Sequence, residues 1–188
     1  NHVATGTEIL ILMSPGESDP GSEEYAEKVK LVLETWGTDL TQETQLVFLH
    51  CTEVAGENIW CPPQSGDASE SFIWALRQSI THFVASKWVM RVELGTYVLI
   101  PNLISFLSSY DSRHPVFLGK RIVTDTTTYN DPTAGYILSM SAILKILGSC
   151  EELGEPWLEL SVRLAQCGRE AGIRIASSRA PEGGEHFN

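Results

Sequence analysis

The chain has 188 residues, of which 43% are hydrophobic and 20% are charged. This composition is typical of a globular domain and too apolar for a disordered chain. The formal net charge is −11, and residues 1–75 carry 13 acidic and 2 basic side chains, so the whole acidic excess lies in the amino-terminal part. No basic stripe able to neutralise phosphates is present, which excludes nucleic acid as a partner.

The length of the chain predicts a single domain over residues 1–188, because one hydrophobic core can grow to about this size. The longest apolar runs are far shorter than the roughly 20 residues that a membrane-spanning helix needs. The sequence starts at Asn1 without a methionine or a signal peptide. We therefore expect that any targeting or anchor segment has been removed or lies outside this sequence.

Short apolar runs alternate with stretches of helical periodicity along the chain. The predicted strands cover residues 8–13, 45–50, 88–92, 116–118, 136–138 and 173–176. The predicted helices begin near Ser22, Asp67, Pro101, Ser139 and Pro156, and the first of them is expected to end at Gly37. Loops are expected over 51–66 and 124–128, where turn-forming or polar residues accumulate. This alternation favours an α/β fold with a sheet covered by helices, whose ligands bind at the carboxyl ends of the strands.

The four cysteines are Cys51, Cys61, Cys150 and Cys167. Their spacing lacks the close pairs of a zinc site, so disulfides and buried thiols are the two remaining interpretations. A bridge between Cys51 and Cys61 would close the proline-rich loop, and the sequence leaves this possibility open.

Several segments resemble the core 1 β1,3-galactosyltransferase branch of the fringe-like glycosyltransferases, glycosyltransferase family 31. They are Glu34-Thr35-Trp36-Gly37, Lys87-Trp88 followed by Thr96-Tyr97-Val98, Pro101 to Leu107, Pro115 to Arg121, and Ala134 to Ser139, in the order of the family. The resemblance implies a GT-A nucleotide-sugar transferase sandwich with a mixed, mainly parallel sheet. It also implies an endoplasmic reticulum or Golgi lumenal domain, in full-length form a type II membrane protein with an amino-terminal anchor, here truncated at the carboxyl terminus.

The same resemblance implies a disulfide between Cys150 and Cys167, because family members carry cysteines at the matching positions. Active members also carry an aspartate triplet that holds Mn²⁺ against the diphosphate of UDP-galactose. The matching positions here are Glu93, Leu94 and Gly95, and neither leucine nor glycine offers a side-chain oxygen to a hard cation. We therefore expect no metal cofactor. Glu93 is either a residual metal or ribose contact or a solvated carboxylate.

Other positions of the family's site are altered as well. The acidic pair that supplies the family's catalytic base matches Leu160 and Ser161, which leaves the neighbouring Glu159 as a weak candidate base. Lys120 and Arg121 could contact a diphosphate or could simply be solvated. The acceptor-side turn carries a proline at position 132 where the family is rich in glycine, and the scattered histidines at 50, 82 and 114 form no hydrolase triad.

The replacement of the metal triplet, the catalytic base and the glycine-rich turn favours a non-catalytic family member. Such a member would act in mucin-type O-glycan biosynthesis and would resemble the chaperone branch of the family. Residues 119–135 and 167–188 resemble that branch in length or sequence. Its partner would be a core 1 galactosyltransferase-like enzyme. The alternative is an active enzyme that moves galactose from UDP-galactose to a GalNAc-bearing glycoprotein acceptor, with Mn²⁺ or with Lys120 and Arg121 neutralising the diphosphate. A degraded duplicate with neither activity is a third possibility.

Overall fold

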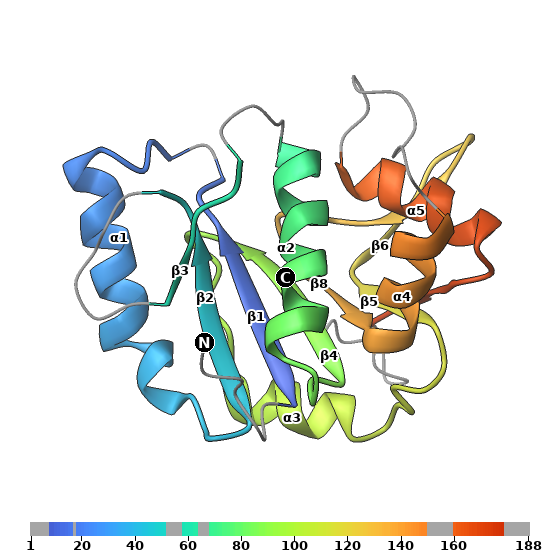
Figure 1. The fold of residues 1–188 in the computed structure, drawn as a ribbon, viewed down its shortest axis with the longest axis horizontal. Coiled ribbons are helices and arrows are strands. Elements are labelled where there is room, and N and C mark those ends of the chain that lie inside the picture. Colours follow the sequence, from blue (N-terminus) through green and yellow to red (C-terminus); the bar gives the residue numbers. More distant parts are fainter. Residues whose placement is uncertain (1–7, 17, 52–57, 64–67, 150–159, 179–188) are drawn as a thin grey trace.

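The computed structural model describes residues 8–16, 18–51, 58–63, 68–149 and 160–178. Seven strands form one sheet in the order β3-β2-β1-β4-β8-β5-β9 (Figure 1). These strands are β1 (Ile9–Ser14), β2 (Thr44–Leu49), β3 (Ile59–Trp60), β4 (Trp88–Glu93), β5 (Val116–Gly119), β8 (Tyr136–Ser139) and β9 (Arg174–Ser177). Strand β8 runs antiparallel to both of its neighbours and every other pair is parallel, which confirms the predicted mixed, mainly parallel α/β sheet.

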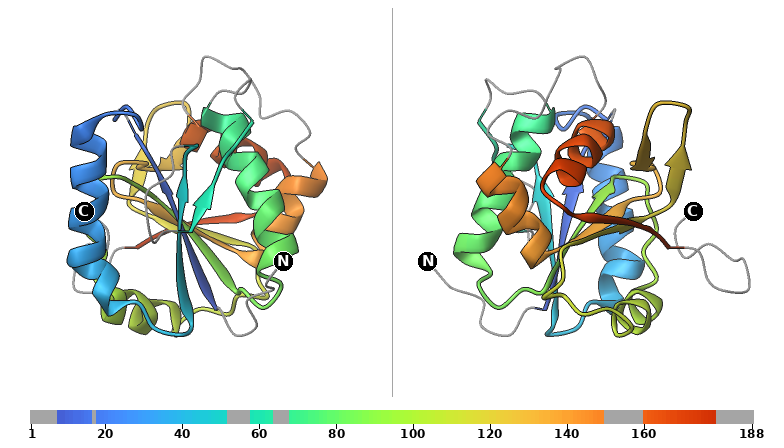
Figure 2. Two further views of the ribbon diagram at one scale, coloured as in Figure 1. Left: turned by 60° about the vertical axis from the view of Figure 1, so that its left-hand side comes forward. Right: turned by 90° about the vertical axis from the view of Figure 1, so that its right-hand side faces the viewer.

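Helices cover both faces of this sheet, as the edge-on view in Figure 2 shows. They are α1 (Glu23–Glu34), the 3₁₀ helix η1 (Trp36–Asp39), α2 (Ala68–His82), α3 (Ile100–Leu107), α4 (Met140–Ser149) and α5 (Leu160–Glu170). Side chains of α1, η1 and α3 pack in one apolar cluster, and side chains of α2, α4 and α5 pack in another. Because successive strand residues face opposite sides, Ile11 and Met90 enter the first cluster while Leu12 and Val89 enter the second.

Local sequence signals position the helix starts. The Ser22 hydroxyl accepts a hydrogen bond from the backbone N–H of Tyr25 at 3.1 Å, so Ser22 caps α1 as predicted. The predicted end at Gly37 is wrong, because α1 stops at Glu34 and Gly37 lies in the 3₁₀ turn that follows. There a β-carbon on Gly37 would lie only 2.8 Å from the carbonyl oxygen of Val32, so this turn packs tightly on the end of the helix.

Three short strands fall where the sequence predicted no strand. Strand β3 lies inside the predicted loop over 51–66, and β6 (Arg121–Val123) pairs with β7 (Thr128–Asn130) in a separate antiparallel hairpin. Two or three residues are too few to show a period of two, and tertiary contacts hold these segments in place. The predicted helix starts at Asp67 and Pro156 lie outside the described residues.

A disulfide joins Cys51 and Cys61. The sequence left open whether these two cysteines form a bridge, and they do. The disulfide ties the end of β2 to the residue that follows β3. Cys167 in α5 is also disulfide-bonded, and Cys150, its predicted partner, lies outside the described residues. Within the described part of the chain, no helix is both long enough and apolar enough to cross a membrane.

Candidate functional site

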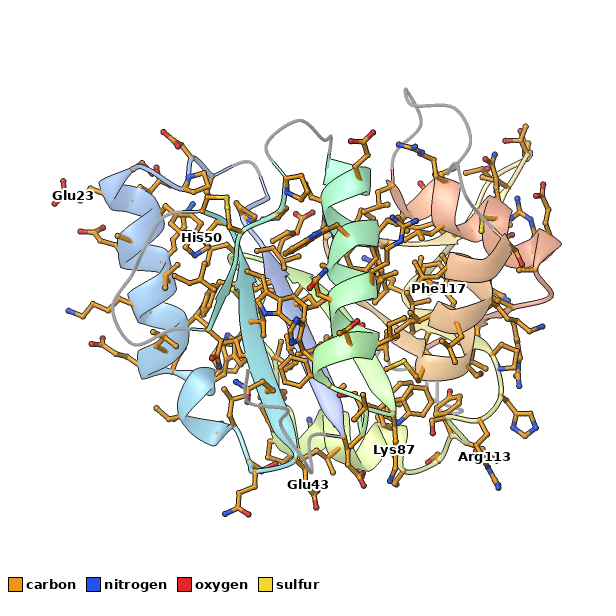
Figure 3. The ribbon with its side chains drawn as sticks, in the orientation of Figure 1. Glu23, Glu43, His50, Lys87, Arg113 and Phe117 are labelled. Carbon is orange, nitrogen blue, oxygen red and sulfur yellow. A yellow bond between two sulfur atoms is a disulfide. The ribbon has the colours of Figure 1, made fainter. Side chains whose placement is uncertain are left out.

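The carboxyl ends of four strands meet at one edge of the sheet. Strands β1, β2 and β4 are parallel, and β5 points the same way because β8 runs opposite to both β4 and β5. In Figure 3, His50 marks this edge, just after β2, while Glu43 and Lys87 mark the other edge. Ligands of α/β sheets bind at the carboxyl edge, and Glu93, Lys120 and Arg121 follow or end strands there.

The turn of residues 93–95 is the centre of the candidate site. Glu93 ends β4 opposite Ser14 of β1, and its side chain is 30% exposed. The next side chain, Leu94, is buried in the apolar cluster on the opposite face of the sheet, and its backbone N–H donates to the carbonyl of Ser14 at 2.9 Å. Gly95 has a φ of 115°, a conformation that residues with a side chain rarely adopt. The turn therefore presents one carboxylate, from Glu93.

This carboxylate already has a cationic partner. Nη2 of Arg91 lies 3.1 Å from Oε1 of Glu93, and the Arg91 side chain is only 9% exposed. The guanidinium carbon lies 6.0 Å from the ring centre of Phe72 and 5.7 Å from that of Tyr136, within cation–π range of both. The sequence predicts a strand through Arg91 and no role for its side chain. The only sequence feature that could have pointed to Arg91 is the presence of a charged residue within the otherwise apolar run of Trp88 to Val92.

Lys120 and Arg121, the two basic residues that could contact a diphosphate, have different surroundings. Nζ of Lys120 lies 3.4 Å from Oδ2 of Asp131, and Arg121 is exposed on β6. Partial burial would raise the pKa of Asp131, but hydrogen bonds from the Thr133 hydroxyl and backbone N–H, together with the Lys120 ammonium, outweigh burial and lower the pKa. Lys120 is thus held by a carboxylate of the acceptor-side turn.

The acceptor-side turn reaches β4 at Gly135. This glycine has a φ of 76°, and its backbone N–H donates to the carbonyl of Pro132 at 3.1 Å. A β-carbon at position 135 would lie 3.0 Å from the backbone oxygen of Arg91, so only glycine allows this close approach. Beside Gly119, the side chain of Asn130 is fully buried and donates to the carbonyl of Phe117 at 3.2 Å.

Of the remaining sequence candidates, His50 also lies at this edge, but its side chain is part of the buried core. Glu159, the candidate base, lies outside the described residues, and Leu160 and Ser161 are buried in the first turn of α5. His50 is buried edge-to-face with the Tyr25 ring. The other two histidines lie on elements away from the 93–95 turn: His82 at the end of α2, and His114 before β5. Among the described residues, no group of three His, Cys, Asp or Glu side chains could hold a metal ion.

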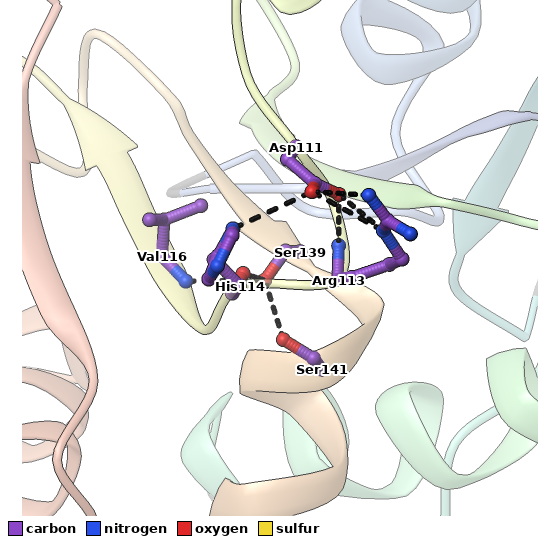
Figure 4. Close-up of polar contacts among 6 residues, drawn as sticks. All are labelled: Asp111, Arg113, His114, Val116, Ser139 and Ser141. Carbon is purple, nitrogen blue, oxygen red and sulfur yellow. Dashed lines mark hydrogen bonds and ion pairs between the residues drawn. The ribbon is translucent and has the colours of Figure 1, made fainter.

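The opposite edge of the sheet carries a separate polar cluster (Figure 4). The Arg113 guanidinium donates to both carboxylate oxygens of Asp111, and these hydrogen bonds lower the pKa of Asp111 to about 2. His114 lies 3.6 Å from the same carboxylate. Ser139, fully buried, links this loop to β8 and α4. A groove of about 560 Å³ borders Asp111 and Arg113 at this edge.

Comparisons with known proteins agree with this architecture. The family model described as Fringe-like matches residues 22–141. The chain is 28% identical over 109 residues to glycoprotein-N-acetylgalactosamine 3-beta-galactosyltransferase 1 of Xenopus laevis, a match that covers 55% of this chain and 29% of that protein.

Two solved structures share the fold. A glycosyltransferase involved in the glycosylation of the major capsid of PBCV-1 superposes with a TM-score of 0.54 at 14% identity, covering 90% of this chain and 80% of that one. The 4-diphosphocytidyl-2C-methyl-D-erythritol synthase of Anaerococcus prevotii gives 0.53 at 11% identity, covering 92% and 89%. The structures show the fold alone, while the family model spans most of the chain. The chain therefore belongs to the Fringe-like family, within glycosyltransferase family 31, and is glycosyltransferase-like in character.

Proposed function

We propose that this chain is a non-catalytic, galactosyltransferase-like protein that acts as a chaperone-like partner of a core 1 galactosyltransferase in mucin-type O-glycan biosynthesis. It would do so in the lumen of the endoplasmic reticulum or Golgi. The observation that carries the proposal is the turn of residues 93–95, at the positions that the family resemblance assigns to the metal-binding triplet.

Each residue of this turn has a structural use that differs from metal binding. The Glu93 carboxylate is paired with Arg91, and Leu94 is buried among apolar side chains. Gly95 has no side chain and a backbone conformation in which an aspartate would be strained. Mn²⁺ requires several oxygen ligands in a defined geometry, and this turn offers the oxygens of a single, already paired carboxylate. The residues present therefore do not fit the metal.

A chaperone-like role requires exposed apolar side chains that can contact an incompletely folded partner. Tyr97 and Leu99, on the segment between the turn and α3, are 61% and 55% exposed. The intervening Val98 is buried and fixes the segment to the core. The exposed disulfide of Cys51 and Cys61 supports an oxidising compartment such as the secretory lumen.

Two assays test the proposal. In the first, UDP-galactose is titrated with and without Mn²⁺, a GalNAc-bearing peptide is offered as acceptor, and thermal stability and galactose transfer are measured. We expect no manganese-dependent stabilisation and no transfer, because a ligand stabilises a protein only when it binds the folded state. Manganese-dependent transfer at a rate typical of enzymes would refute the proposal and establish the active galactosyltransferase instead.

The second assay measures recovery of activity when a denatured core 1 galactosyltransferase is refolded with this chain. We expect the chain to raise the recovered activity, and the double substitution Tyr97→Ser and Leu99→Ser to remove most of the effect. Val123→Ser is the control, because Val123 is similarly exposed, at 66%, but lies on the β6–β7 hairpin. A chain that does not change the recovery, or a double variant that works as well as the unaltered chain, would contradict the chaperone-like role.

A further inference from the structure

The disulfide of Cys51 and Cys61 lies on the surface, whereas the disulfide-bonded cysteine of α5 is buried. Both Cys51 and Cys61 are exposed. Cys167 packs in the apolar cluster with α2 and α4 and is only 8% exposed. In thiol–disulfide exchange a thiolate must reach one of the bonded sulfurs directly, so access limits the reaction. The first disulfide meets this requirement and the second does not.

Contacts other than the disulfide hold β3 at the outer edge of the sheet (Figure 1). The carbonyl of Asn58 accepts a hydrogen bond from the backbone N–H of Phe48 at 2.8 Å, and Trp60 pairs with Leu49 of β2. The Trp60 ring also lies 6.2 Å from that of Trp74 in α2, in an edge-to-face arrangement. Reduction of the disulfide removes none of these contacts.

The folded chain can therefore exist with this disulfide either closed or open. A disulfide stabilises a protein mainly by restricting its unfolded state, so reduction lowers the stability and leaves the native contacts of β3 in place. Exposed disulfides also tend to have more oxidising potentials than buried structural ones, and they are the ones found in labile or catalytic roles. Exposure and independence from the fold are the two properties that an exchange site requires.

We propose that Cys51 and Cys61 form a thiol–disulfide exchange site that oxidises pairs of cysteine thiols in a peptide chain. A substrate thiolate attacks one sulfur of the bridge, the S–S bond breaks, and its electron pair leaves on the other sulfur as a thiolate. The second substrate thiolate attacks the mixed disulfide and releases the second cysteine. The substrate gains the disulfide bond, and the two protons of its thiols end on Cys51 and Cys61. This activity goes beyond the chaperone-like role and does not depend on it.

The first measurement compares the two disulfides within the unaltered, folded chain. The oxidised chain is treated with a low concentration of dithiothreitol without denaturant, free thiols are alkylated at intervals, and the modified cysteines are identified by mass spectrometry. We expect Cys51 and Cys61 to be alkylated at least about tenfold faster than Cys167, because burial hinders attack on its sulfur. The selectively reduced chain should still unfold in one cooperative thermal transition. Equal rates, or alkylation of Cys51 and Cys61 only after denaturant is added, would overturn the proposal.

The second measurement follows the substrate. A reduced synthetic peptide with two cysteines is mixed with an excess of the oxidised chain in the absence of oxygen, and the reaction is stopped with acid. We expect disulfide-bonded peptide, with a matching quantity of chain reduced at Cys51 and Cys61. The double substitution Cys51→Ser and Cys61→Ser is the control, because it removes this bridge and retains Cys167, and it should leave the peptide reduced.

Two results of the peptide assay count against the exchange site. An unaltered chain that leaves the peptide reduced lacks the activity, and a double variant that oxidises the peptide equally well shows that the activity lies elsewhere. Should the double variant fail to fold, the identity of the cysteines that become reduced in the unaltered chain still decides the question. Reduction at Cys51 and Cys61 supports the proposal, and reduction at Cys167 alone refutes it.

Discussion

Ser139 offers the sharpest test of the packing described above. Its buried hydroxyl accepts hydrogen bonds from the backbone N–H groups of Val116, at 3.1 Å, and Ala142, at 3.2 Å, and donates to the carbonyl of His114 at 2.8 Å. One side chain therefore caps α4, fixes the start of β5 and holds the preceding loop (Figure 4). Ser139→Ala removes all three of these hydrogen bonds.

The expected loss of folding stability follows from these hydrogen bonds. Loss of a serine helix cap costs about 1 kcal/mol, and a buried N–H left without a partner, here that of Val116, costs about 1–3 kcal/mol. We expect the free energy of unfolding to fall by about 3 kcal/mol, a substantial part of the roughly 5–15 kcal/mol of a typical domain. For a chain of this length, this corresponds to a decrease of about 6–12 °C in melting temperature.

Urea unfolding followed by circular dichroism measures this loss. Ser141→Ala is the control, because the Ser141 hydroxyl has one long contact, 3.4 Å from that of Ser139, and should cost less than about 0.5 kcal/mol. If the two variants lost the same stability, or if Ser139→Ala lost less than about 0.5 kcal/mol, the three-way role assigned to the hydroxyl would be wrong.

Three further predictions concern other parts of the fold. Replacing Cys51 and Cys61 together by serine opens a loop closed over a separation of 10 residues and should lower the free energy of unfolding by about 3 kcal/mol, measured by urea titration against the oxidised chain. Gly119→Ala places a β-carbon 3.0 Å from a side-chain atom of β7 and 3.1 Å from one of β8, and should lower thermal stability by about 1–3 kcal/mol, whereas Gly148→Ala, with open space around it, should not. Arg113 lowers the pKa of Asp111 from 3.8 to about 2, so this carboxylate stabilises the fold above pH 3.8 and the effect is lost as the pH falls toward 2. Over that window, unfolding midpoints of Asp111→Asn should fall less steeply than those of the unaltered chain, and equal slopes would contradict the assignment.

The sequence allowed prediction of those elements that contain their own signal. Ser22 with the apolar spacing behind it predicted α1, and the run from Ile9 to Met13 predicted β1 because a buried parallel strand is continuously apolar. The hairpin of β6 and β7 carries no such signal. Its strands are three residues long, β6 is largely exposed, and the hairpin is defined by pairing with itself and by contact with α5 and β9. A local pattern cannot report such tertiary contacts.

The candidate site was predictable to a similar degree. Family resemblance and the strand pattern placed Glu93 at the end of a strand, and the structure has it there. The pairing of Glu93 with Arg91 was missed, because the buried position of Arg91 depends on aromatic rings from α2 and β8 that lie 19 and 45 residues away in the sequence. The pairing of Lys120 with Asp131 was missed for the same reason, since it depends on how the β6–β7 hairpin folds back.

The reversed direction of β8 has a consequence for how this fold can vary. A parallel connection must carry the chain back along the full length of the sheet, usually through a helix, so its length is constrained. Strands β5 and β8 are antiparallel neighbours, so the segment between them leaves and re-enters at the same edge. Lengthening it costs only about 0.6 kcal/mol of loop-closure entropy for each doubling, while the strand register stays fixed. Insertions between Lys120 and Gly135 can therefore reshape the ligand edge and leave the rest of the scaffold intact.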